Sequence, residues 1–436
     1  MKLYVITLGC PKNRVDTEFI LGSLKSSLSH LELVNSCKES DVILINTCSF
    51  IKDAVEESID TILETASEKS NDQPLIVTGC LVERYGVKTL KKEMPEVDHF
   101  LGFKEIQHLP KILNNSPPIK NQCRILSTPP WRAYLKISEG CSNRCTYCLI
   151  PKIRGPQECR PPDSILKEAK ELVKNGVKEI TLVAQDLTAY QHQNSDLADL
   201  LNLLAKSLKQ TWLRLLYLYP SRINNKLLET IAAHPNICPY FDIPIQHTSD
   251  PILKKMGRQY TQSDILATIA SIKAKISSAY FRTSIIVGFP GETEQDFQNL
   301  KDIIKQIEFD HLGCFIYSDE DEAPSSRLPD KVNLDIAKAR QAEIMELQQH
   351  ISNKKNKKLI GTVQDVLVEG YSDETDLLLV GRTKYQAPEI DGQVFINDGF
   401  ANSGDVVKVK ITDSYLYDLI GKILSPSSNN SQLEAR

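Results

Sequence analysis

Three cysteines stand close together at Cys141, Cys145 and Cys148, directly after an apolar, strand-like segment at residues 131–137. A loop with this spacing can wrap three thiolates around one small iron–sulfur cluster, because each turn of chain brings a sulfur to a neighbouring iron. The loop offers no fourth cysteine at a similar spacing, so one metal is left without a protein ligand. A catalytic metal needs such an open position, whereas a structural metal avoids it.

The spacing alone leaves other roles open for these thiols. They could form part of a structural zinc site that Cys159 or a distant histidine completes. They could also be disulfide partners, although nothing else in the chain indicates a secreted protein. The chain has eleven cysteines, an odd number that metal binding explains better than disulfides do.

The composition is that of an ordinary globular protein, with 41% hydrophobic and 25% charged residues over 436 positions. This length predicts two or three domains. A net charge of -4 gives no general reason to expect binding to nucleic acid or to an acidic membrane. No apolar run approaches a membrane span of about 18 residues, and Met1 leads into a strand rather than a signal peptide. We therefore expect a cytoplasmic protein with no membrane partner.

The first domain, expected at residues 1–116, repeats one strand–helix unit three times, and each strand ends at a cysteine. The three strands are expected at residues 3–8, 41–46 and 75–78. Short continuous apolar runs of this kind indicate strands buried on both faces of a parallel sheet, in a doubly wound α/β domain. The carboxyl ends of such strands share one edge, so Cys10, Cys48 and Cys80 should converge there. They could be buried structural thiols, but the repeated position favours a second three-cysteine cluster with an open iron.

The central domain, expected at residues 130–335, contains about six strand–helix units. This alternation predicts a partial, open version of the parallel TIM barrel, with its chemistry at the carboxyl ends of the strands. Gln185 follows one of these strands, and Gly288 to Glu292 follow another, where glycine permits close backbone approach to a ligand. His247 lies at a third strand end and could equally be a hydrogen-bonded scaffold residue. The remaining cysteines are taken as structural thiols: Cys37, Cys123, Cys159, Cys238 and Cys314.

The third part begins with a helical connection at residues 336–356 and continues as a small β-barrel at residues 357–424. Small barrels of this sort often bind RNA through a basic face. Acidic residues outnumber basic residues in this one, which should repel phosphates and attract a basic protein, so RNA is the less favoured partner. Residues 425–436 are expected to be a disordered tail.

The spacing C-x3-C-x-aromatic-C, with Tyr147 before the third cysteine, resembles the signature of radical S-adenosylmethionine enzymes. The order of domains and cysteines then resembles the methylthiotransferase family of these enzymes over essentially the whole chain up to the tail. The resemblance implies two four-iron, four-sulfur clusters, S-adenosylmethionine as radical source and methyl donor, and a C-terminal TRAM barrel. The implied ligands are Cys141, Cys145 and Cys148 for the radical cluster and Cys10, Cys48 and Cys80 for the second. The implied contacts with S-adenosylmethionine are Tyr147, Gln185, Gly288 and Glu292.

Two branches of this family compete. Cys10-Pro11-Lys12-Asn13 and residues 382–392 resemble the branch that methylthiolates an aspartate β-carbon of small-subunit ribosomal protein S-twelve. Residues 256–261 resemble the tRNA branch equally well, so a tRNA methylthiotransferase remains the alternative. The resemblance also implies an electron donor such as flavodoxin or ferredoxin, and a sulfur donor. Two other classes are distinguishable by metal content: a radical methylase or mutase with one cluster, and a zinc-binding RNA module.

Overall fold

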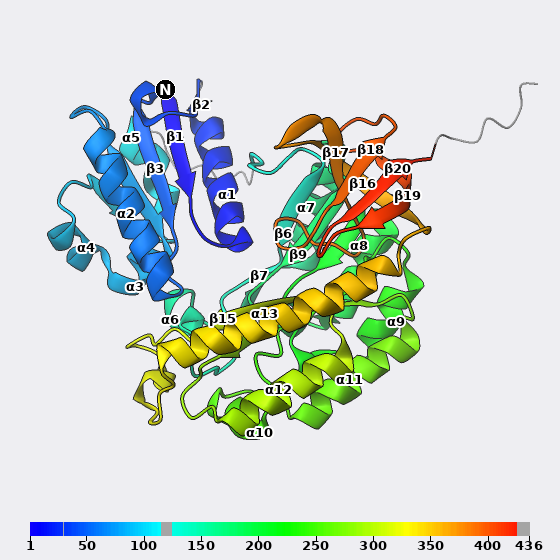
Figure 1. The fold of residues 1–436 in the computed structure, drawn as a ribbon. Helices are drawn as coiled ribbons and strands as arrows, with labels where there is room; N and C mark the ends of the chain where they lie inside the picture. Colours follow the sequence, from blue (N-terminus) through cyan, green and yellow to red (C-terminus); the bar gives the residue numbers. More distant parts are fainter. Residues whose placement is uncertain (29, 115–123, 425–436) are drawn as a thin grey trace, which may run out of the picture.

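The computed structural model describes residues 1–28, 30–114 and 124–424, and these form three domains (Figure 1). The expected tail at residues 425–436 and the expected structural thiol Cys123 lie outside the described residues. Among the described residues, no helix combines the length and the apolar character needed to cross a membrane.

The N-terminal domain is a five-stranded, wholly parallel sheet in the order β2-β1-β3-β4-β5, covered by helices on both faces (Figure 1). Every residue of β3 and of β4 is buried, as their continuous apolar sequences predict. Successive residues of β3 enter separate hydrophobic cores, because side chains alternate between the two faces of a sheet. The predicted doubly wound architecture is confirmed. The strands are β1 (Lys2–Thr7), β2 (Glu32–Val34), β3 (Val42–Thr47), β4 (Leu75–Gly79) and β5 (His99–Leu101), and the helices are α1 (Pro11–Ser27), α2 (Lys52–Glu68), α3 (Cys80–Tyr85), α4 (Val87–Glu93) and α5 (Leu109–Asn114).

The central domain is the predicted open barrel, built from six parallel strands that form two hydrogen-bonded sheets, β12-β9-β6 and β13-β14-β15. The sheets meet where Leu213 pairs with Ile237. Outward-facing apolar residues of the strands pack against the surrounding helices in the largest hydrophobic core. The strands are β6 (Arg132–Lys136), β9 (Glu179–Val183), β12 (Trp212–Leu215), β13 (Tyr240–Asp242), β14 (Tyr280–Val287) and β15 (His311–Ile316), and the helices are α6 (Ile150–Ile153), α7 (Pro162–Lys174), α8 (Leu197–Ser207), α9 (Asn225–Ala233), α10 (Asp250–Lys255), α11 (Gln262–Lys275) and α12 (Glu294–Ile307).

A long helix, α13 (Leu334–Lys357), crosses the front of the barrel in Figure 1 and leads into the C-terminal domain. That domain is a closed five-stranded barrel in the order β16-β17-β18-β20-β19, as predicted. Its core is filled by alternating apolar residues such as Val366 and Val368 of the first strand. The strands are β16 (Val363–Ser372), β17 (Thr375–Thr383), β18 (Val394–Asp398), β19 (Val406–Ser414) and β20 (Leu419–Ile423).

The three domains share one buried apolar cluster on the inner side of the open barrel. Val15 of α1 contributes from the N-terminal domain, and Leu367 and Ala387 contribute from the C-terminal domain. The central domain supplies residues of its strands and of the segments next to them: Tyr134, Val183, Trp212, Leu216, Cys238 and Tyr240. The other two domains therefore close the side that an incomplete barrel leaves open.

A buried ion cluster ties the C-terminal barrel to the central domain. Arg382 of β17 donates a hydrogen bond to Glu179 of β9 at 2.7 Å, and Arg214 of β12 donates to the other oxygen of Glu179 at 2.5 Å. All three side chains are at most 1% exposed. Burial alone would raise the pKa of Glu179, but the charges of Arg214 and Arg382 outweigh it and lower the pKa to about 2. The carboxylate therefore stays ionised.

Residues 382–392, which resemble the ribosomal-protein branch, form the rest of this attachment. Glu389 accepts hydrogen bonds from Arg14 of α1 and from Arg132 and Tyr134 of β6, at 3.1 to 3.2 Å. Asp391 accepts one from the Tyr240 hydroxyl at 2.6 Å. This segment thus connects all three domains. Its acidic residues serve the attachment rather than a charged outer face.

We predict that Glu179→Gln destabilises the protein by about 3–5 kcal/mol, because it leaves two buried guanidinium groups without their carboxylate. Thermal unfolding followed by circular dichroism measures the effect. The matched control is Glu56→Gln on the exposed face of α2, which should change stability by less than about 0.5 kcal/mol. Equal melting temperatures for the two variants would contradict the role assigned to Glu179.

The stability that the Glu179 carboxylate contributes should depend on pH. Its pKa in the folded protein is about 2, below its ordinary value of 4.5. A group whose pKa falls on folding stabilises the protein above its unfolded-state pKa, and this contribution disappears as the pH falls through the folded-state value. The difference in melting temperature between the parent protein and Glu179→Gln should therefore shrink between pH 4.5 and pH 2. A difference that stays constant over this range would contradict the assignment.

Candidate active site

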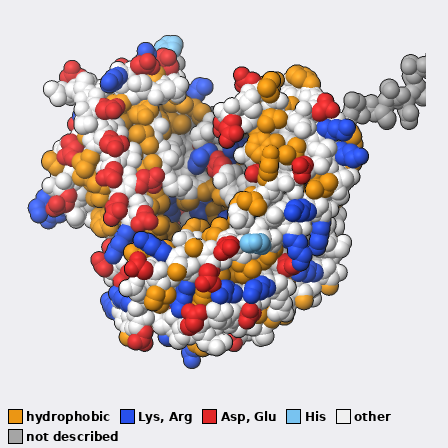
Figure 2. All heavy atoms as spheres, in the orientation of Figure 1, with side chains coloured by type: hydrophobic (Ala, Val, Ile, Leu, Met, Phe, Trp, Pro, Cys, Tyr) orange, Lys and Arg blue, Asp and Glu red, His pale blue; other side chains and the backbone are white. Residues whose placement is uncertain are grey.

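Six cysteines line one cavity of about 500 Å³ between the N-terminal and central domains. Cys10, Cys48 and Cys80 come from the N-terminal domain, and Cys141, Cys145 and Cys148 come from the central domain. The carboxyl ends of the parallel strands of both domains thus face the same space. In Figure 2 the surface of the molecule is hollowed between the N-terminal domain and the remaining two.

Strand ends explain the position of the first three thiols. Cys10 follows β1 as the residue before α1, Cys48 follows β3, and Cys80 begins α3 directly after β4. Gly9 has a φ of +83°, and a Cβ added there would lie 2.7 Å from the Cys48 sulfur. Only glycine lets the β1–α1 turn pass so close to the second thiol.

The loop of the second three thiols is held by neighbouring backbone. The Cys141 amide donates to the Gly155 carbonyl at 3.0 Å, and the Thr146 amide donates to the Met256 carbonyl at 3.0 Å. Gly257 has a φ of +70°, and a Cβ there would lie 2.5 Å from the Arg144 carbonyl oxygen. The segment at residues 256–261, which resembles the tRNA branch, thus has a structural reason for its sequence. It supports the cysteine loop.

Each set of thiols is contacted by one arginine side chain, which is buried for Arg154 and partly buried for Arg258. Arg154 donates to the Cys80 sulfur at 3.3 Å and to the Asn13 side-chain oxygen at 3.0 Å. Arg258 donates to the Cys145 sulfur at 3.3 Å and to the Tyr147 hydroxyl at 3.4 Å. Hydrogen bonds and positive charge at cysteine sulfurs are among the factors that set the reduction potential of an iron–sulfur cluster.

Burial is the largest influence on the thiols themselves. It raises the pKa of Cys80 to about 11 and that of Cys148 to about 12, although Arg154 and Arg258 act in the opposite direction. Burial would also raise the pKa of Cys10, but Lys12, Arg154 and backbone amides outweigh it and lower the pKa. Metal binding to the buried thiols must therefore include loss of their protons.

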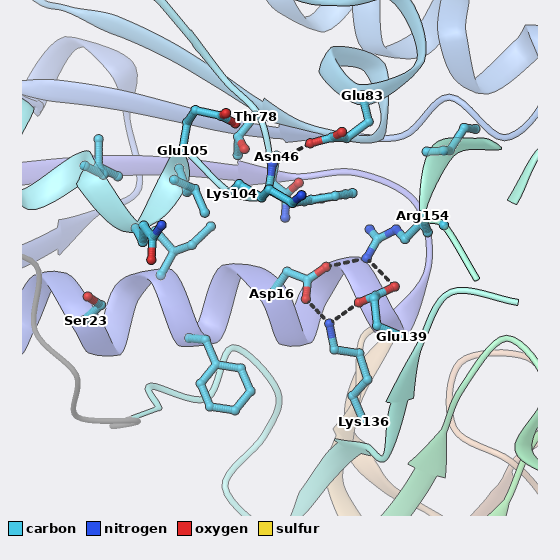
Figure 3. A pocket seen from close by; sticks show the side chains of 18 of the residues that line it. Asp16, Ser23, Asn46, Thr78, Glu83, Lys104, Glu105, Lys136, Glu139 and Arg154 are labelled. Carbon is cyan, nitrogen blue, oxygen red and sulfur yellow. Dashed lines mark hydrogen bonds and ion pairs between the residues drawn. The ribbon is translucent and has the colours of Figure 1, made fainter. Parts of the chain in front are cut away.

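A four-membered charge cluster, made of Asp16, Lys136, Glu139 and Arg154, adjoins the six-cysteine cavity and contributes Arg154 to its lining. Arg154 contacts Asp16 of α1 at 2.7 Å and Glu139 of the short strand β7 (Ser138–Glu139) at 3.1 Å. Lys136 contacts both carboxylates. Burial would raise the pKa of Glu139, but Lys136 and Arg154 lower it to about 2. All four residues line a second cavity of about 810 Å³ (Figure 3).

The structure brings two of the four expected S-adenosylmethionine contacts to the six-cysteine cavity. Tyr147 and Gln185 line it, and Gln185 also donates to Glu139 at 2.9 Å. Gly288 and Glu292 are not among its lining residues. The Glu292 carboxylate is buried and accepts the backbone amides of Gly288 and Phe289, so it shapes the glycine turn behind the site.

His247, at another strand end, is also fully buried. Its Nδ1 accepts the Ser249 amide at 2.9 Å, and its Nε2 lies 3.7 Å from Glu292. This environment fits the scaffold alternative for His247.

The sequence analysis did not identify Arg154, Arg258 or Tyr217 as cavity residues. No spacing rule points to them, because each is brought to the site by a loop whose path only the fold decides.

The six cysteine thiols could bind either single metal ions, such as zinc, or iron–sulfur clusters. In the part of the chain described, no three Cys, His, Asp or Glu side chains are grouped closely enough to share one metal ion. An iron–sulfur cluster has a different requirement, since each thiolate binds its own iron. Cys159 does not line the cavity and accepts the Gln191 amide at 3.4 Å, so nothing here supports its completing a zinc site. The six thiols therefore fit two clusters better than single ions.

Comparisons with known proteins define the class. Residues 135–304 match the sequence model of the Radical SAM superfamily, residues 360–424 match the TRAM domain, and residues 2–102 match uncharacterized protein family UPF0004. The radical S-adenosylmethionine methyltransferase TsrM from Kitasatospora setae has a similar fold, with a TM-score of 0.56 at 13% identity over 84% of this chain and 78% of that chain. The cobalamin-dependent radical enzyme OxsB aligns over 80% of this chain and 56% of that chain, with a TM-score of 0.51 at 12% identity. The fold and site are those of a radical S-adenosylmethionine enzyme, a superfamily that implies a four-iron, four-sulfur cluster and S-adenosylmethionine.

Curated relatives narrow the class further. The ribosomal protein uS12 methylthiotransferase RimO of Geobacter sulfurreducens is 45% identical over 97% of this chain and 99% of its own length. The RimO protein of Myxococcus xanthus is 44% identical over 97% of this chain and 91% of its own length. The chain belongs to this family of radical S-adenosylmethionine methylthiotransferases.

We predict that Arg154→Gln weakens iron retention about 10- to 100-fold, because partners that orient metal ligands typically contribute that much to affinity. Iron released during a timed challenge with a chelator measures this. Lys152→Gln is the matched control, since Lys152 lies on α6 two residues away with its side chain 56% exposed. Equal iron release from the two variants would show that Arg154 does not support a cluster.

Proposed function

We propose that this chain adds a methylthio group to the β-carbon of an aspartate in ribosomal protein uS12. One observation carries the proposal: six cysteines in two sets of three line a single cavity. The relatives described above, which are named for this activity, support the choice of substrate. A β-carbon hydrogen of aspartate is not acidic enough for removal by an ordinary base, so a radical route fits the chemistry.

The proposal gives each set of thiols one four-iron, four-sulfur cluster. Cys141, Cys145 and Cys148 bind the radical cluster, and Cys10, Cys48 and Cys80 bind the second. When bound, the first supplies the electron that cleaves S-adenosylmethionine for hydrogen abstraction, the second holds sulfur, and another S-adenosylmethionine supplies the methyl group. A shared cavity allows the substrate carbon to meet both clusters without moving between sites.

Residues around the two sets have separate tasks. Tyr147, positioned by its contact with Arg258, and Gln185, positioned by Glu139, contact S-adenosylmethionine. Gly288 and Glu292 act from behind the cavity, because the Glu292 carboxylate holds the glycine turn. The apolar side of the cavity, which includes Phe50 and Ile51, excludes water from the reacting groups.

The C-terminal barrel supplies a surface for a basic ribosomal protein. Its charges are unevenly distributed: Glu369, Glu389 and Asp391 belong to the attachment between domains, while Lys410 and Lys422 lie side by side on β19 and β20. Three exposed acidic residues lie together at the tip of the β16–β17 hairpin: Asp373, Glu374 and Asp376. In Figure 1 this orange hairpin projects toward the gap beside the N-terminal domain. We propose that uS12 docks at this tip.

The remaining partners follow from the chemistry. Each turnover consumes electrons and sulfur, so the proposal includes a small electron-transfer protein such as flavodoxin or ferredoxin and a sulfur donor. The ribosomal substrate places the enzyme in the cytoplasm.

The substrate prediction is tested in cells with and without this chain. We expect mass spectrometry of intact ribosomal proteins to find one methylthio group on uS12 that disappears when the chain is deleted and returns with a plasmid copy. Nucleoside analysis of tRNA from the same cells should be unchanged. Loss of a methylthio-adenosine from tRNA, with uS12 unaltered, would replace the proposed substrate by tRNA.

The assignment of ligands is tested by two triple variants. Replacing Cys10, Cys48 and Cys80 by alanine should reduce the iron content after anaerobic reconstitution from about eight to about four atoms per chain. It should preserve formation of 5′-deoxyadenosine and abolish the methylthio product. Replacing Cys141, Cys145 and Cys148 should stop 5′-deoxyadenosine formation. Normal product from the first variant would overturn the role of the second cluster.

A further inference from the structure

Three cationic side chains line the six-cysteine cavity: Lys12, Arg154 and Arg258. Each of the two arginines donates four hydrogen bonds within the protein. Arg154 donates to Asp16, Glu139, Asn13 and Cys80. Arg258 donates to the Pro244 carbonyl, the Tyr260 hydroxyl, the Cys145 sulfur and the Tyr147 hydroxyl.

Lys12 differs from both. It is only 8% exposed, and within residues 1–28, 30–114 and 124–424 its ammonium group makes neither a hydrogen bond nor an ion pair. Its nitrogen lies 3.8 Å from the centre of the Tyr217 ring, which offers only the attraction of a π face. A buried charge normally has a partner of opposite charge. Besides Cys10, whose pKa the Lys12 charge lowers, an anionic group that enters the cavity would be a partner for this ammonium group.

The surroundings of Lys12 restrict where that anion lies. Lys12 stands two residues after Cys10 in the first turn of α1, so its charge belongs to the side of the cavity with the second thiol set. Tyr217, which it contacts, is at the carboxyl end of β12 and has a φ of +65°, with its amide held by Asp242 at 2.9 Å. Lys12 and Tyr217 both line the cavity, so the ammonium group lies where the end of β12 meets the second thiol set.

We propose that Lys12 binds the side-chain carboxylate of the substrate aspartate and thereby positions its β-carbon beside the Cys10, Cys48 and Cys80 set. This inference rests on the proposed function. The carboxyl carbon is bonded directly to the β-carbon, so a cation that holds the carboxylate holds the reacting atom within one bond. An ammonium–carboxylate hydrogen bond is stronger than a neutral one. Lys12 is therefore a specificity-determining residue for an acidic side chain.

The test measures the affinity of two enzymes for two forms of the substrate protein. Anaerobically reconstituted parent enzyme and Lys12→Met are each titrated with unmodified uS12 and with uS12 whose target aspartate is replaced by asparagine. Methionine retains most of the length of the lysine and removes only the charge. We expect the parent enzyme to bind the aspartate form about 10- to 100-fold more tightly than the asparagine form, which is the usual contribution of one charged hydrogen bond. Lys12→Met should bind the two forms equally.

Two controls separate this role from a structural one. The iron content of each variant is measured, and affinities are compared between preparations of equal iron content, because the Lys12 charge also acts on Cys10. Lys12→Arg should recover part of the preference for aspartate, because it restores the charge with different geometry.

Three outcomes would overturn the inference. These are a Lys12→Met enzyme that keeps the full preference for aspartate, one that loses affinity for both substrates equally, and one that cannot be loaded with iron to the content of the parent; each would assign Lys12 to another task. If the parent enzyme neither binds nor modifies uS12, the proposed function itself fails and the inference falls with it. That result differs from the first three because it is already seen without any substitution.

Discussion

The charge cluster of Asp16, Lys136, Glu139 and Arg154 is the constraint on which the site depends. It joins helix α1 of the N-terminal domain to the cysteine loop of the central domain, and Arg154 extends from it to the Cys80 sulfur. Two sheets whose strand ends carry thiols can react with one substrate only if those ends face each other at a fixed separation. Hydrophobic contact is non-directional and tolerates sliding, whereas a buried network of charges is satisfied in one arrangement. The same network thus sets the position of one domain against the other.

The second attachment, around Glu179 and Arg382, performs the corresponding task for the C-terminal barrel. Its loop at residues 382–392 enters the open side of the central barrel and reaches α1 through Glu389 and Arg14. An incomplete barrel exposes the inner faces of its strands, and here two neighbouring domains cover them. The chemistry of the cavity and the surface of the C-terminal barrel are therefore held in one body, so a docked protein substrate meets the thiols in a defined orientation.

Much of the architecture could be predicted from local sequence. Continuous apolar runs marked the buried strands of the N-terminal domain. Helix α12 begins after Thr293, which forms a capping box with Asp296, a pattern that residues three positions apart specify locally. The limits appear where distant segments meet. Gly288 and Glu292 stand at a strand end, as a cofactor contact should, yet the Glu292 side chain turns back to hold its own loop. Sequence position indicates which end of the sheet a residue occupies, but not which way its side chain points.

The sequence by itself determined the residue types that can bind iron, their division into two sets of three, and the order of the three domains. These depend on spacing and on alternation of polar and apolar residues, which are properties of neighbouring positions. Only the tertiary structure decided that all six thiols share one cavity, that Arg154 and Arg258 each contact one set, and that Lys12 enters the space without a partner. The physical reason is that these contacts join residues more than 70 positions apart or lie across a domain boundary. Packing between domains, rather than local periodicity, brings such residues together.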